Sequence, residues 1–70
     1  MNFSDKVYTL RTKKGLTQVE LAKLVNVSQS MIWQFEKKNR KPTPNTAIQL
    51  AKTLGVKLDD LMNDERNIEY

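Results

Sequence analysis

The sequence predicts an all-α fold, and two observations carry this prediction. Apolar residues recur three or four positions apart in each stretch between turn residues, as on one face of a helix. No segment shows the sustained alternation of apolar and polar residues that a half-buried strand needs. Cap and turn residues divide the chain into five short segments, each with one apolar stripe, so each helix is expected to bury its stripe against another.

The first helix is expected to begin at Ser4 and to end at Gly15. A serine hydroxyl caps a helix N-terminus, and glycine takes the left-handed conformation that ends a helix at no steric cost. Phe3 precedes this cap and Tyr8 follows it by four residues, which is the spacing of a hydrophobic staple.

The second and third helices are predicted to form a helix-turn-helix over residues 17–38. Thr17 and Glu20 have the spacing of a capping box, Asn26 suits a left-handed turn, and Ser28 caps the next helix. The inward residues of this pair are expected to be Leu21, Val25, Val27, Ile32 and Phe35. A separation of about three residues is typical of the helix-turn-helix. The spacing alone also fits an ordinary αα-hairpin in a small bundle.

The last two helices follow a basic loop at residues 37–41. Thr43 is expected to cap the fourth helix, with Pro44 at its first position, where a missing N–H costs nothing, and Gly55 to end it. A short fifth helix is predicted from about Leu58 to Met62. The whole chain, residues 1–70, is predicted to be one domain, with a core at 4–62 and a C-terminal tail at 63–70.

Composition excludes several classes of site. The 70 residues contain no cysteine and no histidine, so a disulfide scaffold, a Cys- or His-based zinc site and the usual nucleophile–base pairs are missing. We therefore expect no catalytic residue, no metal and no cofactor. With no apolar run of about 20 residues and no signal-peptide pattern, a cytoplasmic location is expected.

Charge is distributed unevenly. Residues 1–56 carry ten Lys and Arg against three Asp and Glu, whereas residues 57–70 carry two against five, within a net charge of +4. A basic body with an acidic end suits a polyanionic partner on one face, although a solvated surface has the same composition.

Several spaced motifs between Leu10 and Met62 together resemble one family. They are Leu10-Arg11, Gly15-Leu16-Thr17-Gln18, Glu20-Leu21-Ala22, Val27-Ser28, Ile32, Phe35-Glu36, Lys41-Pro42, Leu54-Gly55-Val56 and Leu58-Asp59-Asp60-Leu61. This pattern resembles the lambda-repressor and Cro-like (Xre-type) helix-turn-helix domain of phage and bacterial repressors. Asn26 stands where the family often has glycine, and Lys57 where it often has a serine cap. The resemblance implies sequence-specific binding of double-stranded DNA by a five-helix domain.

The helix that opens at Ser28 is the expected recognition helix. Its first turn reaches base edges in this motif, and residues four positions later share the same outward faces. The expected base contacts are Gln29, Ser30, Trp33 and Gln34. Glutamine can pair with adenine N6 and N7. Solvation is the alternative for the glutamines, and clamping against a neighbouring helix is the alternative for Trp33.

Phosphate contacts are expected on both sides of this helix. The resemblance gives this role to a glutamine at the start of the second helix, here Gln18, and helix N-termini and basic side chains favour it elsewhere. The expected residues are Thr17, Gln18, Ser28, Lys37, Lys38, Asn39, Arg40 and Lys41. Such contacts supply affinity and register without sequence information. The resemblance also implies a structural ion pair between Arg11 and Glu36.

The leading interpretation is a homodimeric transcriptional repressor on a palindromic operator, because one such module makes few base contacts. The expected dimer surface comprises Leu58, Leu61, Met62, Ile68 and Tyr70. Alternatively, Leu58 and Leu61 only close the monomer core. A protein-interaction module or antitoxin-like partner with the same fold is the competing function, and an enzyme is the least favoured.

Overall fold

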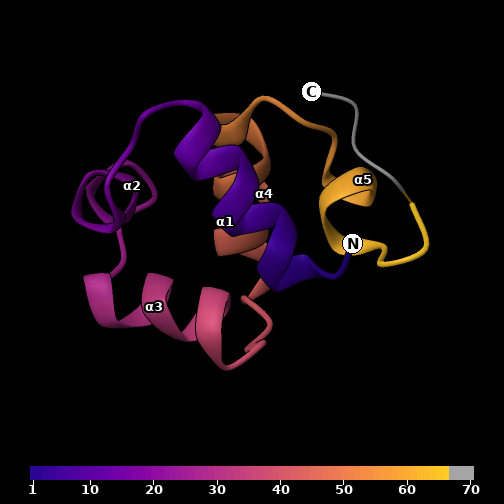
Figure 1. Cartoon of the computed structure of the whole chain (residues 1–70), viewed down its shortest axis with the longest axis horizontal. Helices are drawn as coiled ribbons and strands as arrows, with labels where there is room; N and C mark the ends of the chain where they lie inside the picture. The colour runs from indigo at the N-terminus through magenta and orange to yellow at the C-terminus, as the bar shows by residue number, and fades with distance from the viewer. Residues whose placement is uncertain (67–70) are drawn as a thin grey trace.

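The computed structural model describes residues 1–66 of the chain. This part contains five helices and no strand: α1 (Phe3–Lys13), α2 (Gln18–Leu24), α3 (Gln29–Lys37), α4 (Pro44–Leu54) and α5 (Leu58–Met62). The all-α prediction is therefore confirmed. In Figure 1, α3 runs along the lower edge of the molecule, where it packs against α1 and α2, while α5 packs against α1 and α4 at the other side.

Most predicted helix boundaries are present. Thr17, Ser28 and Thr43 each cap a helix with a side-chain oxygen that accepts a backbone N–H. Gly55 ends α4 in the left-handed conformation, with a φ of 76°. Asn26 has a φ of 58°, so asparagine does take the left-handed turn between α2 and α3. These short polar side chains set the boundaries locally, which is why the sequence predicts them.

The start of α1 differs from the prediction. The cap is Asn2, whose side-chain oxygen accepts the Asp5 N–H over 2.9 Å, and Ser4 lies inside the helix. Ser4 is buried because its hydroxyl contacts the carbonyl oxygen of Phe35 on α3. The predicted staple is also wrong, since Phe3 is buried against Phe35 while Tyr8 is exposed. A contact between α1 and α3 thus shifts the boundary by two residues.

The core lies where the five apolar stripes meet. Its fully or nearly buried hydrophobic residues are Phe3, Val7, Leu10, Leu21, Ala22, Val25, Ile32, Phe35, Leu50, Ala51, Leu54 and Leu61. The edge-to-face pair of Phe3 and Phe35, with ring centroids 5.8 Å apart, joins α1 to α3. This packing fixes which side of α3 faces inward and leaves its opposite side on the surface.

A buried lysine holds α5. Lys6 is fully buried, and its ammonium donates over 2.7 Å to each of two carbonyl oxygens, those of Asp60 and Asn63, at the C-terminal end of α5. A cation at this end complements the helix dipole and satisfies carbonyls that have no partner within the helix. Because Lys57 makes no side-chain cap at the other end, α5 depends on this contact and on the burial of Leu61.

Candidate nucleic-acid interface

The outward side of α3 carries all four side chains expected to read bases. Gln29, Ser30 and Trp33 are exposed and Gln34 is half-buried, whereas Ile32 and Phe35 point into the core. Trp33 is 42% exposed, so it lies outside the core. Instead the Lys38 ammonium lies 5.7 Å from the centroid of its ring. The helix therefore presents a polar and aromatic surface to the solvent.

The start of α3 is suited to an anion. Ser28 Oγ accepts the Met31 N–H over 3.1 Å, which leaves the hydroxyl proton free to donate. The first turn contains no acidic residue. The positive end of the helix dipole is therefore uncompensated by any side chain of its own first turn, and a phosphate next to Ser28 would be attracted to it.

A relay of hydrogen bonds connects α1, α2 and α3 behind this surface. Arg11 holds Glu36 through two contacts, Nε to Oε2 at 2.6 Å and Nη2 to Oε1 at 2.9 Å. Gln18 Nε2 donates to Glu36 Oε1 over 3.2 Å, and Gln29 Nε2 donates to Gln18 Oε1 over 3.2 Å. The resemblance implied an ion pair for Arg11 and Glu36, whereas Gln18 and Gln29 were expected to contact phosphate and a base. The fold joins all four in one chain of hydrogen bonds that ends at the outward side of α3.

The charged pair at the base of this relay is buried. The side chains of Arg11 and Glu36 are 11% and 1% exposed. The hydrogen bonds that Arg11 donates to Glu36 outweigh the opposing effect of burial and raise the pKa of Arg11 above its already high ordinary value. Arg11 also donates to the Leu16 carbonyl oxygen over 2.8 Å. These contacts of Arg11 hold the segment before α2 near the end of α3.

Thr17 is largely occupied by the cap of α2. Its Oγ1 accepts the Glu20 N–H over 3.0 Å, and its own N–H donates to Glu20 Oε1 over 2.8 Å. Only its hydroxyl proton remains to donate to a phosphate, because the backbone N–H already has a partner. Gln18 keeps part of its hydrogen-bonding capacity, since its carboxamide has two donors and two lone pairs and the relay uses one of each.

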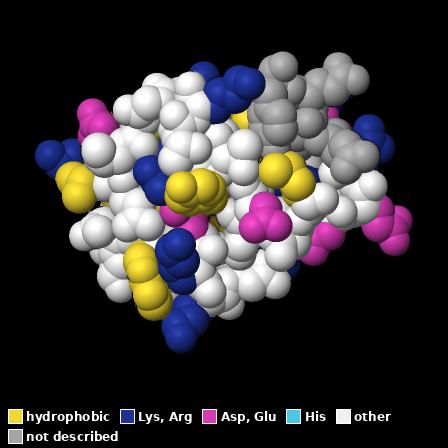
Figure 2. All heavy atoms as spheres, viewed as in Figure 1, with side chains coloured by type: hydrophobic (Ala, Val, Ile, Leu, Met, Phe, Trp, Pro, Cys, Tyr) yellow, Lys and Arg dark blue, Asp and Glu magenta, His cyan; other side chains and the backbone are white. Residues whose placement is uncertain are grey.

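The basic run after α3 is exposed throughout, but its members point in different directions. The Lys37 ammonium lies 5.7 Å from the Tyr8 ring centroid, and Lys41 Nζ lies 3.6 Å from Asp64 Oδ1. Arg40 instead returns to α3, where its Nη1 donates to the side chain of Gln34 over 2.8 Å. In Figure 2, dark blue side chains lie over α3 at the lower edge and also at the left, upper and right edges, and several acidic side chains lie toward α5.

Comparison with known proteins assigns this geometry to a family. A helix-turn-helix family model matches residues 7–61 of the chain. The chain belongs to the helix-turn-helix family. It is 35% identical over 68 residues to the cryptic phage CTXphi transcriptional repressor RstR of Vibrio cholerae, which covers 96% of this chain and 61% of RstR. It is 34% identical over 68 residues to the HTH-type transcriptional activator BcrR of Enterococcus faecalis. This match covers 97% of this chain and 33% of BcrR.

The fold is also similar to that of a solved repressor. The P22 c2 repressor, crystallised in complex with synthetic operator 9T, matches with a TM-score of 0.86 and 27% identity over 90% of this chain and 96% of that one. The resemblance to lambda-repressor and Cro-like domains is thus confirmed. The chain spans less than two thirds of the length of RstR and of BcrR.

Within this helix-turn-helix domain, the expected dimer surface is only partly on the outside. Leu61 is fully buried in the core, so its placement on a dimer surface was wrong. Leu58 is 42% exposed and Met62 is half-buried. Together they help to line an open hollow of about 400 Å³ between α5 and the start of α4; its residues are Pro42, Pro44, Ala47, Leu58, Asp59 and Met62. Ile68 and Tyr70 lie outside the described residues.

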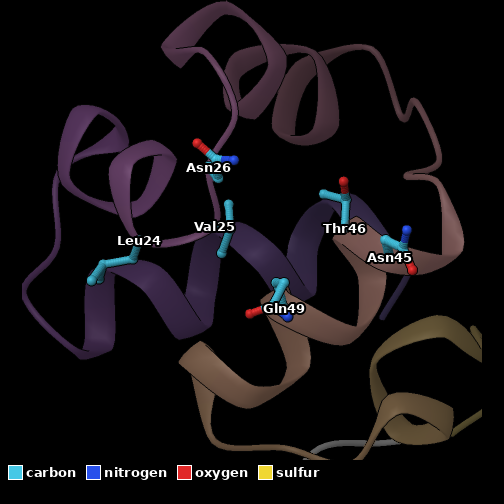
Figure 3. A pocket seen from close by; sticks show the side chains of 6 residues that line it. All are labelled: Leu24, Val25, Asn26, Asn45, Thr46 and Gln49. Carbon is cyan, nitrogen blue, oxygen red and sulfur yellow. The ribbon is translucent and has the colours of Figure 1, made fainter.

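A second hollow, of about 310 Å³, separates the helix-turn-helix from α4. Figure 3 shows side chains from the end of α2 and the following turn on one side and from α4 on the other: Leu24, Val25, Asn26, Asn45, Thr46 and Gln49. None of the six is charged, so the hollow lacks the cations that a phosphate site uses. It is distinct from the outward surface of α3.

The sequence reasoning missed two residues near the interface. The Tyr8 ring is contacted by two cations, the Arg11 guanidinium, 5.4 Å from its centroid, and the Lys37 ammonium. The spacing of Tyr8 and Arg11, three apart on one helix, was the available signal. Ser4 joins α1 to the turn after α3, and its sequence context suggested only a cap. Among the described residues, no cluster of acidic side chains fits a metal ion, and no helix is long and apolar enough to cross a membrane.

Proposed function

We propose that this protein is a transcriptional repressor that binds double-stranded DNA sequence-specifically, with α3 in the major groove. The observation that carries the proposal is the outward side of α3. Its four expected base-reading side chains lie between a helix start without acidic residues and a basic run. Base-edge contacts need exposed polar side chains on a rigid helix, and the relay through Gln18 and Glu36 supplies that rigidity.

The proposed phosphate contacts are those that frame this surface. Gln18 and Ser28 lie at helix starts, and the run at 37–41 begins at the last residue of α3. RstR and the P22 c2 protein are both named repressors, and the latter was solved with an operator. A compact domain that occupies an operator blocks other proteins there, which favours repression over the activation for which BcrR is named. Such a regulator acts in the cytoplasm, where bacterial and phage DNA lies.

We further propose that two copies bind a palindromic operator as a homodimer. Two apolar side chains of α5 that line the hollow between α4 and α5, the exposed Leu58 and the half-buried Met62, are the proposed contact. Burial of this apolar surface against a second copy is favourable. It also doubles the number of bases that are read, since each half-site then receives one α3.

Selection of bound sequences from a random pool of duplex DNA tests the proposal. We expect enrichment of one palindrome whose half-sites are about one helical turn, or 34–36 Å, apart. Enrichment of a single half-site would retain DNA reading but contradict the dimer. No enrichment would overturn sequence-specific binding and favour the interaction-module alternative.

A further inference from the structure

Arg40 contacts one residue of α3 twice. Its backbone N–H lies 3.3 Å from the Gln34 carbonyl oxygen, and its guanidinium Nη1 donates to Gln34 Oε1 over 2.8 Å. On the other side of the carboxamide, Gln34 Nε2 lies 3.4 Å from Ser30 Oγ. The Gln34 oxygen is therefore turned toward the end of α3 and its nitrogen toward the start.

The fold itself brings Arg40 to this position. Asn39 has a φ of 50°, a left-handed conformation that turns the chain back toward α3. The Asn39 side chain is anchored to α1, because its Oδ1 lies 2.9 Å from the hydroxyl of the buried Ser4. The same hydroxyl contacts the Phe35 carbonyl oxygen. The backbone before Arg40 is thus tied to the core, unlike that of a free surface loop.

We infer that Arg40 is a positioning residue that holds the Gln34 carboxamide in one orientation for base reading. The inference rests on the proposed function. A glutamine side chain presents its oxygen and nitrogen in either order, and a bidentate contact with adenine requires one order only. Freezing a flexible side chain on binding costs entropy. Because Arg40 sets the orientation before DNA arrives, less of that entropy is lost when the correct base pair is met.

This role does not compete with a phosphate contact. A guanidinium has five N–H donors, of which one contacts Gln34, so others remain for the DNA backbone. The Gln34 oxygen has two lone pairs and keeps one for a base. Arg40 thereby joins a residue at the base edges to the backbone, whereas the neighbouring ammonium groups of Lys37 and Lys38 lie over the rings of Tyr8 and Trp33.

The first test compares the binding of five variants with that of the wild type on the duplex selected from the random pool and on each single-base substitution of it. The variants are Arg40→Ala, Arg40→Lys, Gln34→Ala, the Arg40→Ala/Gln34→Ala double variant and the matched cation control Lys37→Ala. We expect Arg40→Ala to lower discrimination at the base pair read by Gln34 by about threefold to tenfold, the range for freeing one ordered side chain. Lys37→Ala should weaken all sequences by a common factor.

The remaining variants separate positioning from charge. In the Gln34→Ala background, Arg40→Ala should weaken binding to all sequences by a common factor and leave discrimination unchanged. Arg40→Lys should restore affinity but not discrimination, because a lysine has one flexible ammonium in place of a planar fork. Equal discrimination by the wild type and Arg40→Ala, with only the salt slope reduced by about 0.9, would assign Arg40 to phosphate alone and overturn the inference.

A second test needs no DNA. The side-chain amide of Gln34 in the free protein should be ordered by NMR relaxation in the wild type and in Lys37→Ala, and mobile in Arg40→Ala. An amide equally mobile in all three proteins contradicts positioning by Arg40, even where DNA selection succeeds. A wild type that selects no sequence overturns the proposed function instead, so the two failures are distinguishable.

Discussion

Glu36 joins three helices through one carboxylate. It lies on α3, accepts two hydrogen bonds from Arg11 on α1, and accepts a third from Gln18 at the start of α2. The Glu36 side chain is almost fully buried, so its charge is balanced by the guanidinium of Arg11 rather than by solvent. Removal of one partner leaves the other charge buried without compensation, which costs more than the intact pair contributes.

Glu36→Gln should therefore destabilise the protein strongly. The substitution keeps the shape of the side chain but leaves the Arg11 guanidinium without a counter-charge, and we expect a loss of about 3–5 kcal/mol in the free energy of unfolding. Urea denaturation at neutral pH measures it. Glu65→Gln, at an exposed position, is the matched control and should change little. A loss below about 1 kcal/mol for Glu36→Gln would contradict the buried-pair account.

At the scale of the element, α2 shows how a short helix is started. Seven residues are too few to be stable alone, so the helix relies on its capping box and on the burial of Leu21 and Ala22. The backbone N–H of Thr17 donates to the Glu20 carboxylate, and this hydrogen bond is the largest cause that lowers the pKa of that carboxyl below its ordinary value of 4.5. A carboxyl whose pKa falls on folding stabilises the folded state when it is ionised.

This stabilisation should depend on pH. It is fully present above pH 4.5, the ordinary pKa, and is lost as the pH falls through the lower pKa of the folded state. In Glu20→Gln the amide can still cap Thr17 but cannot titrate. Unfolding midpoints measured from pH 7 to pH 3 should show the wild type above the variant at pH 7 and converging with it below pH 4.5. A constant difference over this range would show that the charge of Glu20 contributes nothing.

Helix α5 depends on tertiary contacts more than α2 does. Its five residues have no side-chain N-cap, and its C-terminal carbonyls are satisfied by Lys6 from α1. Arg66 adds contacts to Asp59 and Asp60, at 3.3 Å and 2.9 Å, on the exposed side. Exposed ion pairs of this kind contribute little, so the buried ammonium and Leu61 hold the helix.

Lys6→Met tests this dependence. Methionine fits the apolar path of the lysine stem but leaves the Asp60 and Asn63 carbonyl oxygens without their donor, which should cost about 1–3 kcal/mol. Lys52→Met, at an exposed lysine of α4, is the control and should be nearly neutral. Amide hydrogen exchange should show that α5 opens more readily in Lys6→Met than in the wild type, and that it is unchanged in Lys52→Met. Unchanged protection of α5 would contradict the account.

At the scale of the whole molecule, positive charge predominates beside α3. The run at 37–41 carries four Lys and Arg and no acidic residue, whereas α5 and the segment after it are acidic, and the two meet where Lys41 Nζ lies 3.6 Å from Asp64 Oδ1. The net positive charge of the run favours the approach of a polyanion from this side. The apolar hollow beside α5 lies near the acidic end, and its occupation by a second copy would leave the basic surfaces of both copies free.

DNA affinity should fall steeply with salt. Each phosphate neutralised by Lys or Arg releases condensed counterions, so the logarithm of the binding constant should decrease with the logarithm of salt concentration at a slope near −0.9 per phosphate contacted. Titration of the selected duplex at several salt concentrations measures it. A complex insensitive to salt would remove the role proposed for the basic run.

Leu58→Glu should weaken dimerisation without unfolding the monomer. The Leu58 side chain is 42% exposed, so a charge there can reach solvent in the free chain but is unfavourable when buried against a second copy. We expect the dimer dissociation constant, measured by sedimentation equilibrium, to rise by at least about tenfold. Leu24→Glu is the control, because Leu24 is also exposed but lies on α2, away from the proposed contact, and its substitution should leave the dimer dissociation constant unchanged. Equal dissociation constants for the two variants would place the dimer surface elsewhere.

The sequence alone determined the features that depend on neighbours along the chain. Thr17, Ser28, Thr43 and Gly55 mark helix ends because their capping chemistry acts over a few residues, and the apolar stripes indicate which side of each helix is inward. The five helices and the outward set on α3 follow from these local rules. The family resemblance supplied the expectation of DNA, which apolar spacing alone does not.

Only the tertiary structure decided which distant side chains meet. It moved the cap of α1 to Asn2, buried Lys6 and Leu61, and turned Arg40 back to Gln34. None of these follows from sequence spacing, because each depends on the angle and distance at which two helices pack. A buried lysine and an exposed one have the same local pattern. The partner that satisfies the charge is supplied by a helix more than 50 residues away.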